Sequence, residues 1–324
     1  MSVAMLERIL FKRILVATDF TECSERAVLV GLDIARQCKA SVHVLNVAPR
    51  EGYGVTGVGM LGAAEFARRD ARRLESDLLR KGYLGGIDCK ITVEKGEVLP
   101  VIASVMEAEG IDLVIAGSHQ RSRPGKLLVG SVAERIFRRS RCPVLVAGPN
   151  LSLSHRAAFP GKVLVPVDLS RPKAEVVPLA KFLADELQAH VIFLNVIRTA
   201  GREATYNQDR AIRYAKSRMR ELVASSNRFG RQAEFEVETG EPADVIVRKA
   251  TEHAVDLVML GVSPPSVLSN RLGASTAYRV VQRAQCPVLT LSRMLRQIGR
   301  GKGLRMQVDD DTESAAMHSC AHAI

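Results

Sequence analysis

The residues with the clearest chemical meaning lie between Gly117 and Ser131, in the segment GSHQRSRPGKLLVGS. Gly117 ends an apolar run, and Gly130 stands just before a segment with helical character. A glycine lets a phosphate approach the backbone, and the N–H groups and dipole of a helix N-terminus attract it. Three basic residues add positive charge: Arg121, Arg123 and Lys126. The pattern indicates a phosphate site, although glycine at a strand end and serine at a helix start also occur for structural reasons alone.

The remaining candidates for chemistry are weaker. His119 has no nucleophile or orienting carboxylate near it in sequence, so we interpret it as a polar loop residue or a neighbour of a phosphate. His43, His190 and His253 lie near the ends of predicted elements, and none has a histidine four residues away. The 6 cysteines form no CxxC pair and show no zinc spacing. We therefore predict no catalytic residue and no metal ligand.

Length and composition limit the class of protein. The chain has 324 residues, a net charge of +11, 47% hydrophobic residues and 25% charged residues. These values are typical of globular proteins and predict about two domains. Charges or glycines interrupt every apolar run, and the first residues are too short and too charged for a secretory signal. We therefore predict a cytoplasmic protein that does not enter a membrane.

An internal repeat supplies the element order. KRILVATD at 12–19 matches GKVLVPVD at 161–168, an offset of 149, and RCPVL at 141–145 matches QCPVL at 285–289, an offset of 144. The chain is therefore a tandem duplication with a seam near 148–152. We place the domains at 10–148 and 160–293, followed by a tail at 294–324. Charged residues and glycines without apolar periodicity predict that this tail is disordered.

Each copy alternates short apolar runs with amphipathic stretches, which predicts a parallel sheet covered on both faces. Strands are expected at 14–18, 42–47, 87–94, 112–116 and 144–147. Helices are expected from a cap at Ser24 to Cys38 and over 63–82, 98–109 and 131–139. In such a doubly wound sheet the ligand crevice lies at the carboxyl ends of the strands. Asp19, Val47 and Gly117 are the residues at these ends.

The whole pattern resembles a tandem universal stress protein, with two family domains in one chain. The resemblance rests on Thr18-Asp19-Phe20, Leu45-Asn46-Val47, Gly96-Glu97 and Cys142-Pro143-Val144-Leu145. It also rests on the family's nucleotide motif, G-x2-G-x9-G-[ST], which falls on Gly117, Gln120, Gly130 and Ser131 with its spacing intact. The resemblance implies two tandem five-stranded, doubly wound α/β sheets of the Rossmann-like, adenine-nucleotide α-hydrolase-like type.

The resemblance also implies a site for ATP or a related adenine nucleotide in the first domain. Asp19 would lie at the adenine or ribose, and Val47 would present backbone groups to the base. Gly117 and His119 would line the phosphate loop. The phosphates would be received at a helix N-terminus by Gly130, Ser131 and Val132. Gln120 departs from the motif, which has its second glycine at this position.

The second copy departs further from the motif. The aligned positions hold Gly261, Pro264, Ala274 and Ser275, so two of the three glycines are replaced. Pro264 also lacks a backbone N–H that could bind a phosphate. We therefore expect a degenerate site in the second domain, which would retain the fold as a structural or regulatory partner.

Partner predictions follow from sheet edges and charge. The fifth strands, at 144–147 and 288–291, are expected to be edges of the two sheets. They can pair within the chain and form an intramolecular pseudo-dimer, and two chains could also form a homodimer.

The basic run from Arg68 to Arg73 alternates with acidic residues, as a solvated helix face does. Aromatic residues are only 4% of the chain, too few for base stacking. We predict no specific nucleic-acid partner, and the sequence identifies no protein partner.

The sequence is compatible with three functions. The first is a non-catalytic stress-response protein that binds ATP or a related nucleotide in its first domain. The second is a nucleotide-free scaffold for protein interaction, which Gln120, Pro264 and Ala274 favour. The third, an enzyme of a related nucleotide-binding fold, is disfavoured because no glycine follows Asp19 in the turn after the first strand and no His-x-Gly-His signature is present.

Overall fold

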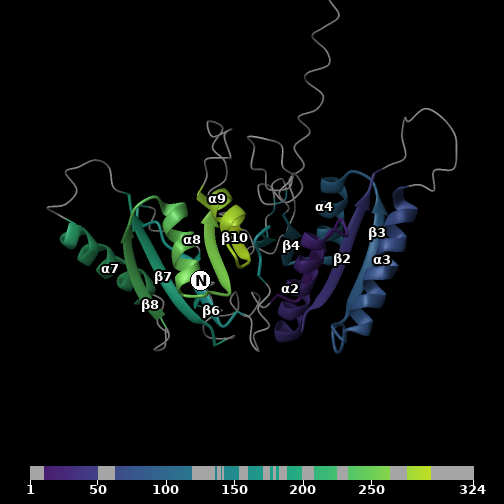
Figure 1. Cartoon of the computed structure of the whole chain (residues 1–324), viewed down its shortest axis with the longest axis horizontal. Coiled ribbons are helices and arrows are strands. Elements are labelled where there is room, and N and C mark those ends of the chain that lie inside the picture. The colour runs from purple at the N-terminus through teal and green to yellow at the C-terminus, as the bar shows by residue number, and fades with distance from the viewer. Residues whose placement is uncertain are drawn as a thin grey trace, which may run out of the picture.

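The computed structural model describes a single ten-stranded sheet with helices on both of its faces (Figure 1). The described residues are 11–49, 63–118, 136, 140, 142–152, 160–170, 176–177, 180–181, 188–198, 208–224, 233–262 and 276–292. The strand order is β3-β2-β1-β4-β5-β10-β9-β6-β7-β8, so each sequence repeat forms one half of the sheet. Within each half all neighbouring strands are parallel, as the alternating pattern predicts.

The first domain follows its predicted element order. Its strands are β1 (Arg13–Ala17), β2 (Ser41–Ala48), β3 (Cys89–Lys95), β4 (Leu113–Gly117) and β5 (Val144–Ala147). Its described helices are α2 (Glu22–Cys38), α3 (Ala63–Arg80) and α4 (Val98–Glu109). Apart from Ile136, which is helical, the predicted fourth helix lies outside the described residues, as do the loop at 52–59 and most of the segment after Gly117.

The second domain repeats this order. Its strands are β6 (Lys162–Pro166), β7 (His190–Ile197), β8 (Ala233–Thr239), β9 (Leu257–Val262) and β10 (Val288–Ser292). Its described helices are α7 (Gln208–Ala224), α8 (Pro242–Glu252) and α9 (Thr276–Arg283). The predicted disordered tail lies outside the described residues. In the part of the chain that the structure describes, no helix is both long and apolar enough to cross a membrane.

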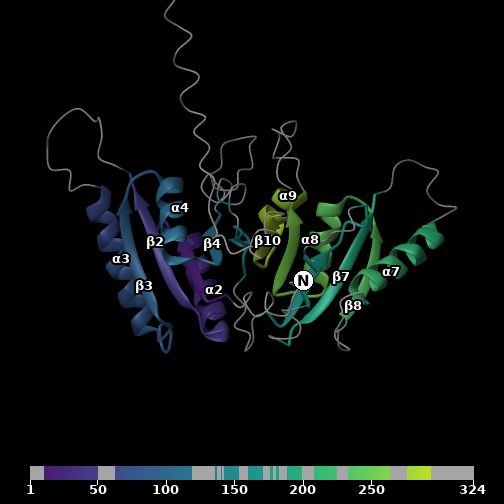
Figure 2. The same cartoon turned by 180° about the vertical axis from the view of Figure 1, so that it is seen from behind.

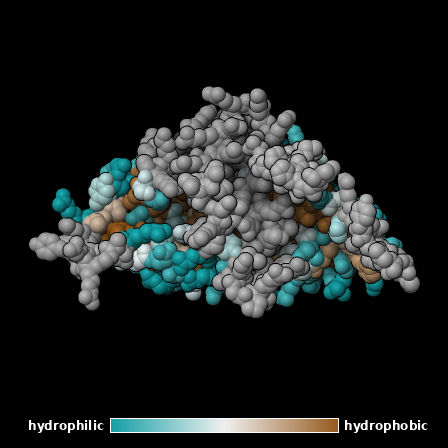
Figure 3. All heavy atoms as spheres, turned by 90° about the horizontal axis from the view of Figure 1, so that it is seen from above, coloured by the Kyte–Doolittle hydropathy of each residue, from teal (hydrophilic) through white to brown (hydrophobic). Residues whose placement is uncertain are grey.

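Alternate residues of the strands supply the two hydrophobic layers. Ile14 and Val16 belong to the layer that includes residues of α2, α3 and α7 on one face, while Leu15 belongs to the layer that includes residues of α4, α8 and α9 on the other. Each layer contains residues of both domains. The continuous apolar strands of the sequence are therefore explained by burial on both faces. Seen from above, hydrophilic residues lie along the outside and hydrophobic residues between them (Figure 3).

The two halves join edge to edge through their fifth strands, which the view from behind also shows (Figure 2). β5 and β10 pair antiparallel, with Leu145 opposite Leu289, and the buried Thr290 hydroxyl donates to the Val144 carbonyl at 2.9 Å. Each strand thereby gives the other the backbone partner that an exposed edge lacks. The predicted pseudo-dimer is confirmed, and the two five-stranded sheets form one continuous sheet.

The segment after β5 reinforces this junction. The Asn150 amide donates to the Gln282 carbonyl at 2.9 Å, and the Ser152 N–H donates to the Gln285 carbonyl at 2.9 Å. A Cβ added to Gly148 would clash with the Val281 carbonyl oxygen, so the close approach of this segment to α9 requires a glycine. The seam between the repeats is thus packed against the second domain.

Candidate functional site

The carboxyl ends of β2, β1 and β4 lie at one edge of the sheet. β1 lies between β2 and β4, and Ala17 pairs with Leu45 of β2 and with Ala116 of β4. β2 follows β1 directly in the sequence, whereas β4 comes much later, so the chain order reverses direction at this place in the sheet. This is the topological switch point, where doubly wound sheets bind ligands. Asp19, Val47 and Gly117 all lie at this edge.

Asp19 forms the turn between β1 and α2. Its Oδ1 atom accepts hydrogen bonds from the backbone N–H of Thr21 at 3.1 Å and from the Thr21 hydroxyl at 2.6 Å. Phe20 between them has a φ of 58°, in the left-handed region that costs about 1–2 kcal/mol for a residue with a side chain. The carboxylate therefore stabilises a tight turn, and Asp19 itself is exposed.

Ser24 does not cap the helix, so that prediction was wrong. α2 begins at Glu22, with Thr21 at the N-cap position, because the tight turn at Phe20 starts the helix three residues earlier. Ser24 lies in the first turn and is 3% exposed. Its hydroxyl lies 3.0 Å from the Thr18 hydroxyl, donates to the Thr21 carbonyl at 2.9 Å and accepts from the Asp19 N–H at 3.3 Å. Ser24 thus ties the helix to the end of β1.

Gly117 lies directly against this first turn of α2. A Cβ at Gly117 would lie 2.8 Å from the Ser24 Cα, 2.9 Å from the Cys23 carbonyl oxygen and 2.9 Å from the Ser24 nitrogen. These are backbone atoms, which cannot rotate away as a side chain can. The packing of α2 on β4 therefore requires a glycine here, before any ligand is considered.

The end of β2 is fixed to the end of β1. The buried Asn46 side chain donates to the Thr18 carbonyl at 2.8 Å, and the Thr18 N–H donates to the Leu45 carbonyl at 3.0 Å. Val47 follows, half-buried and packed on the α4 side of the sheet. From the sequence we predicted Asn46 only as part of a strand. The signal for its role was available, since Asn195 stands at the same place in the second repeat.

The second domain repeats the aspartate hydrogen bonds of this turn. The Asp168 Oδ1 atom accepts from the Ser170 N–H at 3.0 Å and from the Ser170 hydroxyl at 2.6 Å. The Asn195 side chain donates to the Val167 carbonyl at 2.8 Å. At Gly261 the nearest described atom to an added Cβ is the Val176 Cβ at 3.9 Å. The duplicated aspartate and asparagine therefore have a structural role in both domains.

Comparison with known proteins identifies the family. The model of the universal stress protein family matches residues 10–148 and 160–292. The chain belongs to the universal stress protein family. Universal stress protein MJ0531 of Methanocaldococcus jannaschii is 29% identical over 142 residues, which cover 42% of this chain and 82% of that protein. Universal stress protein YxiE of Bacillus subtilis is 23% identical over 147 residues, 42% of this chain and 99% of that protein.

Solved structures match both halves together. A crystal structure of a universal stress protein from Archaeoglobus fulgidus superposes with a TM-score of 0.61 at 21% identity, covering 87% of this chain and 98% of that one. The functionally unknown protein PA1789 from Pseudomonas aeruginosa has a TM-score of 0.61 at 19% identity, covering 92% and 98%. Because the coverage exceeds one domain, the likeness extends to the tandem Rossmann-like architecture of the family.

Only some of the residues assigned from the universal stress protein motif lie in the described part of the chain. Asp19, Val47 and Gly117 end three neighbouring strands, as described above. His119, Gln120, Gly130, Ser131 and Val132 lie outside the described residues, as do Pro264, Ala274 and Ser275. The assignment of these residues to a phosphate site stays a prediction.

The second universal stress protein domain has an ionic network near the start of α9. The Arg279 guanidinium contacts Glu241 at 3.0 Å and Asp244 at 3.1 Å, and Arg283 also pairs with Asp244. Hydrogen bonds from Arg283 and Arg279 hold the pKa of Asp244 below its usual value. The Arg279 side chain is thereby held by Asp244 of α8 and by Glu241, the N-cap residue of that helix.

Proposed function

We propose that this universal stress protein binds ATP or a related adenine nucleotide in its first domain and acts as a non-catalytic, cytoplasmic stress-response protein. The observation that carries the proposal is the position of Asp19, exposed at the end of β1 beside the ends of β2 and β4. A carboxylate at the switch point can accept hydrogen bonds from ribose hydroxyls. Gly130-Ser131, which the family motif retains 13 residues after Gly117, supports a phosphate position in this domain.

Gly117 contributes less to the proposal than its place in the motif suggests. Its lack of a side chain is explained by the approach of α2, so the residue does not by itself indicate a phosphate. The proposal therefore depends on Asp19 and on the Gly130-Ser131 pair.

We propose binding without catalysis because the polar groups at the end of β1 already hold the turn. Asp19 Oδ1 accepts from Thr21, and the Thr18 and Ser24 hydroxyls bond to each other. A bound nucleotide would then change the shape of the loop edge that partner proteins meet. In the second domain the pairing of Arg279 with Glu241 and Asp244 supports the alternative of a nucleotide-free scaffold.

The first test is to purify the chain without added nucleotide, denature it and identify any released small molecule by chromatography and mass spectrometry. Calorimetry with ATP then measures binding to the emptied protein. We expect about one adenine nucleotide per chain, and we expect Gly130→Val to abolish binding by blocking the approach of the phosphates. An empty chain that also fails to bind ATP would leave the scaffold as the function.

Asp19→Asn sharpens this test, and Asp168→Asn is its matched control. Asparagine can still accept the two hydrogen bonds from Thr21, so the turn is kept while the charge is lost. We expect Asp19→Asn to weaken ATP binding by about tenfold or more, the scale of a lost charged hydrogen bond. Equal affinities in the two variants would contradict a site at Asp19.

A further inference from the structure

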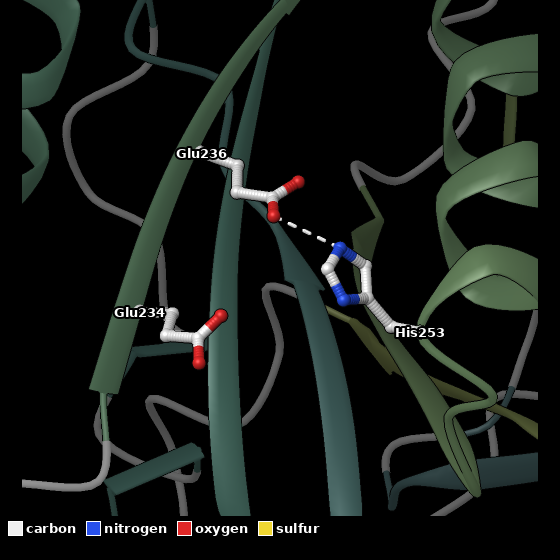
Figure 4. A group of neighbouring side chains, drawn as sticks. All are labelled: Glu234, Glu236 and His253. Atoms are coloured by element: carbon white, nitrogen blue, oxygen red, sulfur yellow. Dashed lines mark ion pairs between the residues drawn. The ribbon is translucent and has the colours of Figure 1, made fainter.

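A second cluster of polar side chains lies in the other domain, far in sequence from the predicted nucleotide site. Glu234 and Glu236 alternate along β8 and therefore point to the same face of the sheet. His253 follows the last residue of α8, on that face. One ligand atom from each of the three residues lies within 4.8 Å of the others, and Figure 4 shows both carboxylates directed toward the imidazole.

The contact between His253 and Glu236 lacks the geometry of a hydrogen bond. The Nε2 atom lies 2.9 Å from Glu236 Oε1, yet Nε2 and the other carboxylate oxygen, Oε2, are buried without a hydrogen-bond partner among the described residues. Buried polar atoms are almost always satisfied. Two donor atoms about 2.0–2.2 Å from one tetrahedral zinc ion lie roughly 3.3–3.6 Å apart, so the two side chains need to separate by only about half an ångström to share a metal ion that would satisfy both.

The charges around the cluster leave these carboxylates incompletely balanced. Lys249 contacts Glu238 at 2.9 Å and Glu252 at 3.2 Å, and Arg248 pairs with the same two residues. Lys249 Nζ also lies 3.3 Å from Glu236 Oε2, whereas the partner of Glu236 Oε1 is His253. Glu234 contacts the His190 imidazole at 3.0 Å. Among the described residues, two cationic side chains thus face four carboxylates, and a divalent cation would balance the other two.

We propose that Glu234, Glu236 and His253 form a binding site for a divalent transition-metal ion of the zinc type. Imidazole nitrogen and carboxylate oxygen are ligands that zinc accepts, and three protein ligands leave a fourth position for water or another molecule. His190 would orient Glu234, as partners of metal ligands commonly do. The prediction of no metal ligand looked for histidines four residues apart, whereas these ligands come from a strand and from the end of a helix.

The first domain has a closed version of the same place. Lys90, Thr92 and Glu109 occupy the positions equivalent to Glu234, Glu236 and His253, by the repeat offset of 144. Lys90 lies 2.8 Å from one oxygen of Glu109, and His43 Nδ1 lies 3.0 Å from the other. His43 Nε2 lies 2.7 Å from the Thr92 hydroxyl. Every group of this cluster has a partner, so we expect no metal there.

The test is a zinc titration of the full chain, first stripped with a chelator and kept reduced, by calorimetry. We compare the unmodified chain with His253→Gln and Glu236→Gln, and Glu109→Gln is the matched control. Even the partner of a metal ligand contributes about 10–100-fold to affinity, so loss of a ligand should weaken zinc binding by more than about 100-fold. The Glu109→Gln variant should bind as the unmodified chain does.

X-ray absorption of the zinc-loaded chain identifies the ligands directly. We expect nitrogen and oxygen neighbours at about 2.0–2.2 Å, and a sulfur shell at about 2.3 Å would mean that cysteines hold the metal and would overturn the proposal. Unchanged affinity in both cluster variants would overturn it as well. Circular dichroism checks that they fold. If Glu236→Gln unfolds, Glu234→Gln decides the question, because the Glu234 side chain is 54% exposed and contributes little to packing.

Discussion

The two domains make the same aspartate hydrogen bonds after their first strand but support this segment differently. In both, an aspartate accepts two hydrogen bonds from the residue two positions later, and an asparagine of the second strand holds the strand end. In the first domain the Thr18 and Ser24 hydroxyls join the turn to α2, whereas the second domain has Val167 in place of Thr18. The hydrogen bonds shared by both copies are therefore structural, and we expect a difference in ligand binding between the domains to come from groups that surround the aspartate.

Gly117 in the first domain gives the largest expected effect on stability. Gly117→Ala would place a methyl group 2.8 Å from the backbone of α2, and the helix would have to move. Overpacking of this kind costs about 1–3 kcal/mol. Urea unfolding of this variant and of the unmodified chain measures the loss, and an unchanged free energy of unfolding would contradict the close packing of α2 on β4.

Asn46 and Asn195 should, in contrast, be equivalent. Each donates to a backbone carbonyl at 2.8 Å in a buried position, and replacement by alanine leaves that carbonyl unsatisfied. We expect Asn46→Ala and Asn195→Ala each to lower the free energy of unfolding by about 1–3 kcal/mol. Denaturant titration checks this. A marked asymmetry would show that the two turns are not supported alike.

Thr18→Val converts one element of the first domain into its counterpart in the second. The change keeps the shape of the side chain but removes the hydroxyl that contacts Ser24 and accepts from the Phe20 N–H. We expect a loss of about 0.5–1.5 kcal/mol, the scale of one hydrogen bond. The melting temperature in the absence of nucleotide gives the measurement. An unchanged value would mean that the hydroxyl network adds nothing beyond packing.

His43 gives the smallest expected difference, and it depends on pH. Burial lowers its pKa below 6.5, an effect that the nearby Glu109 partly opposes. As the pH falls below 6.5, the unfolded chain takes up the proton first, so stability falls until the pH reaches the lower pKa of the folded state. Ile192 holds the equivalent position, so this contribution belongs to the first domain only.

The matched variant for this prediction is His43→Gln. We expect the unmodified chain to lose more stability than His43→Gln between about pH 7 and pH 5. Urea unfolding at the two pH values gives the comparison. Parallel losses would mean that other groups account for the dependence.

Several features follow from the sequence alone because they depend on local periodicity or on repetition. The predicted boundaries of α4 and β5 agree with the structure, and continuous apolar runs predicted strands buried on both faces. The pairing of the fifth strands followed from two apolar edges in one chain. Ser24 was misassigned because its neighbours in sequence resemble a cap, whereas its partner, Thr18, is set by how the helix packs on the strand.

The sequence by itself determined the family, the duplication, the parallel order of strands and the edge at which Asp19, Val47 and Gly117 lie, because these depend on patterns along the chain. Only the tertiary structure shows why position 117 requires a glycine, because the backbone atoms that exclude a side chain belong to a helix almost a hundred residues away in the sequence. It also decided the meeting of Glu234, Glu236 and His253, and the closed cluster around His43. Such contacts depend on distances between elements, which no spacing within one element can encode.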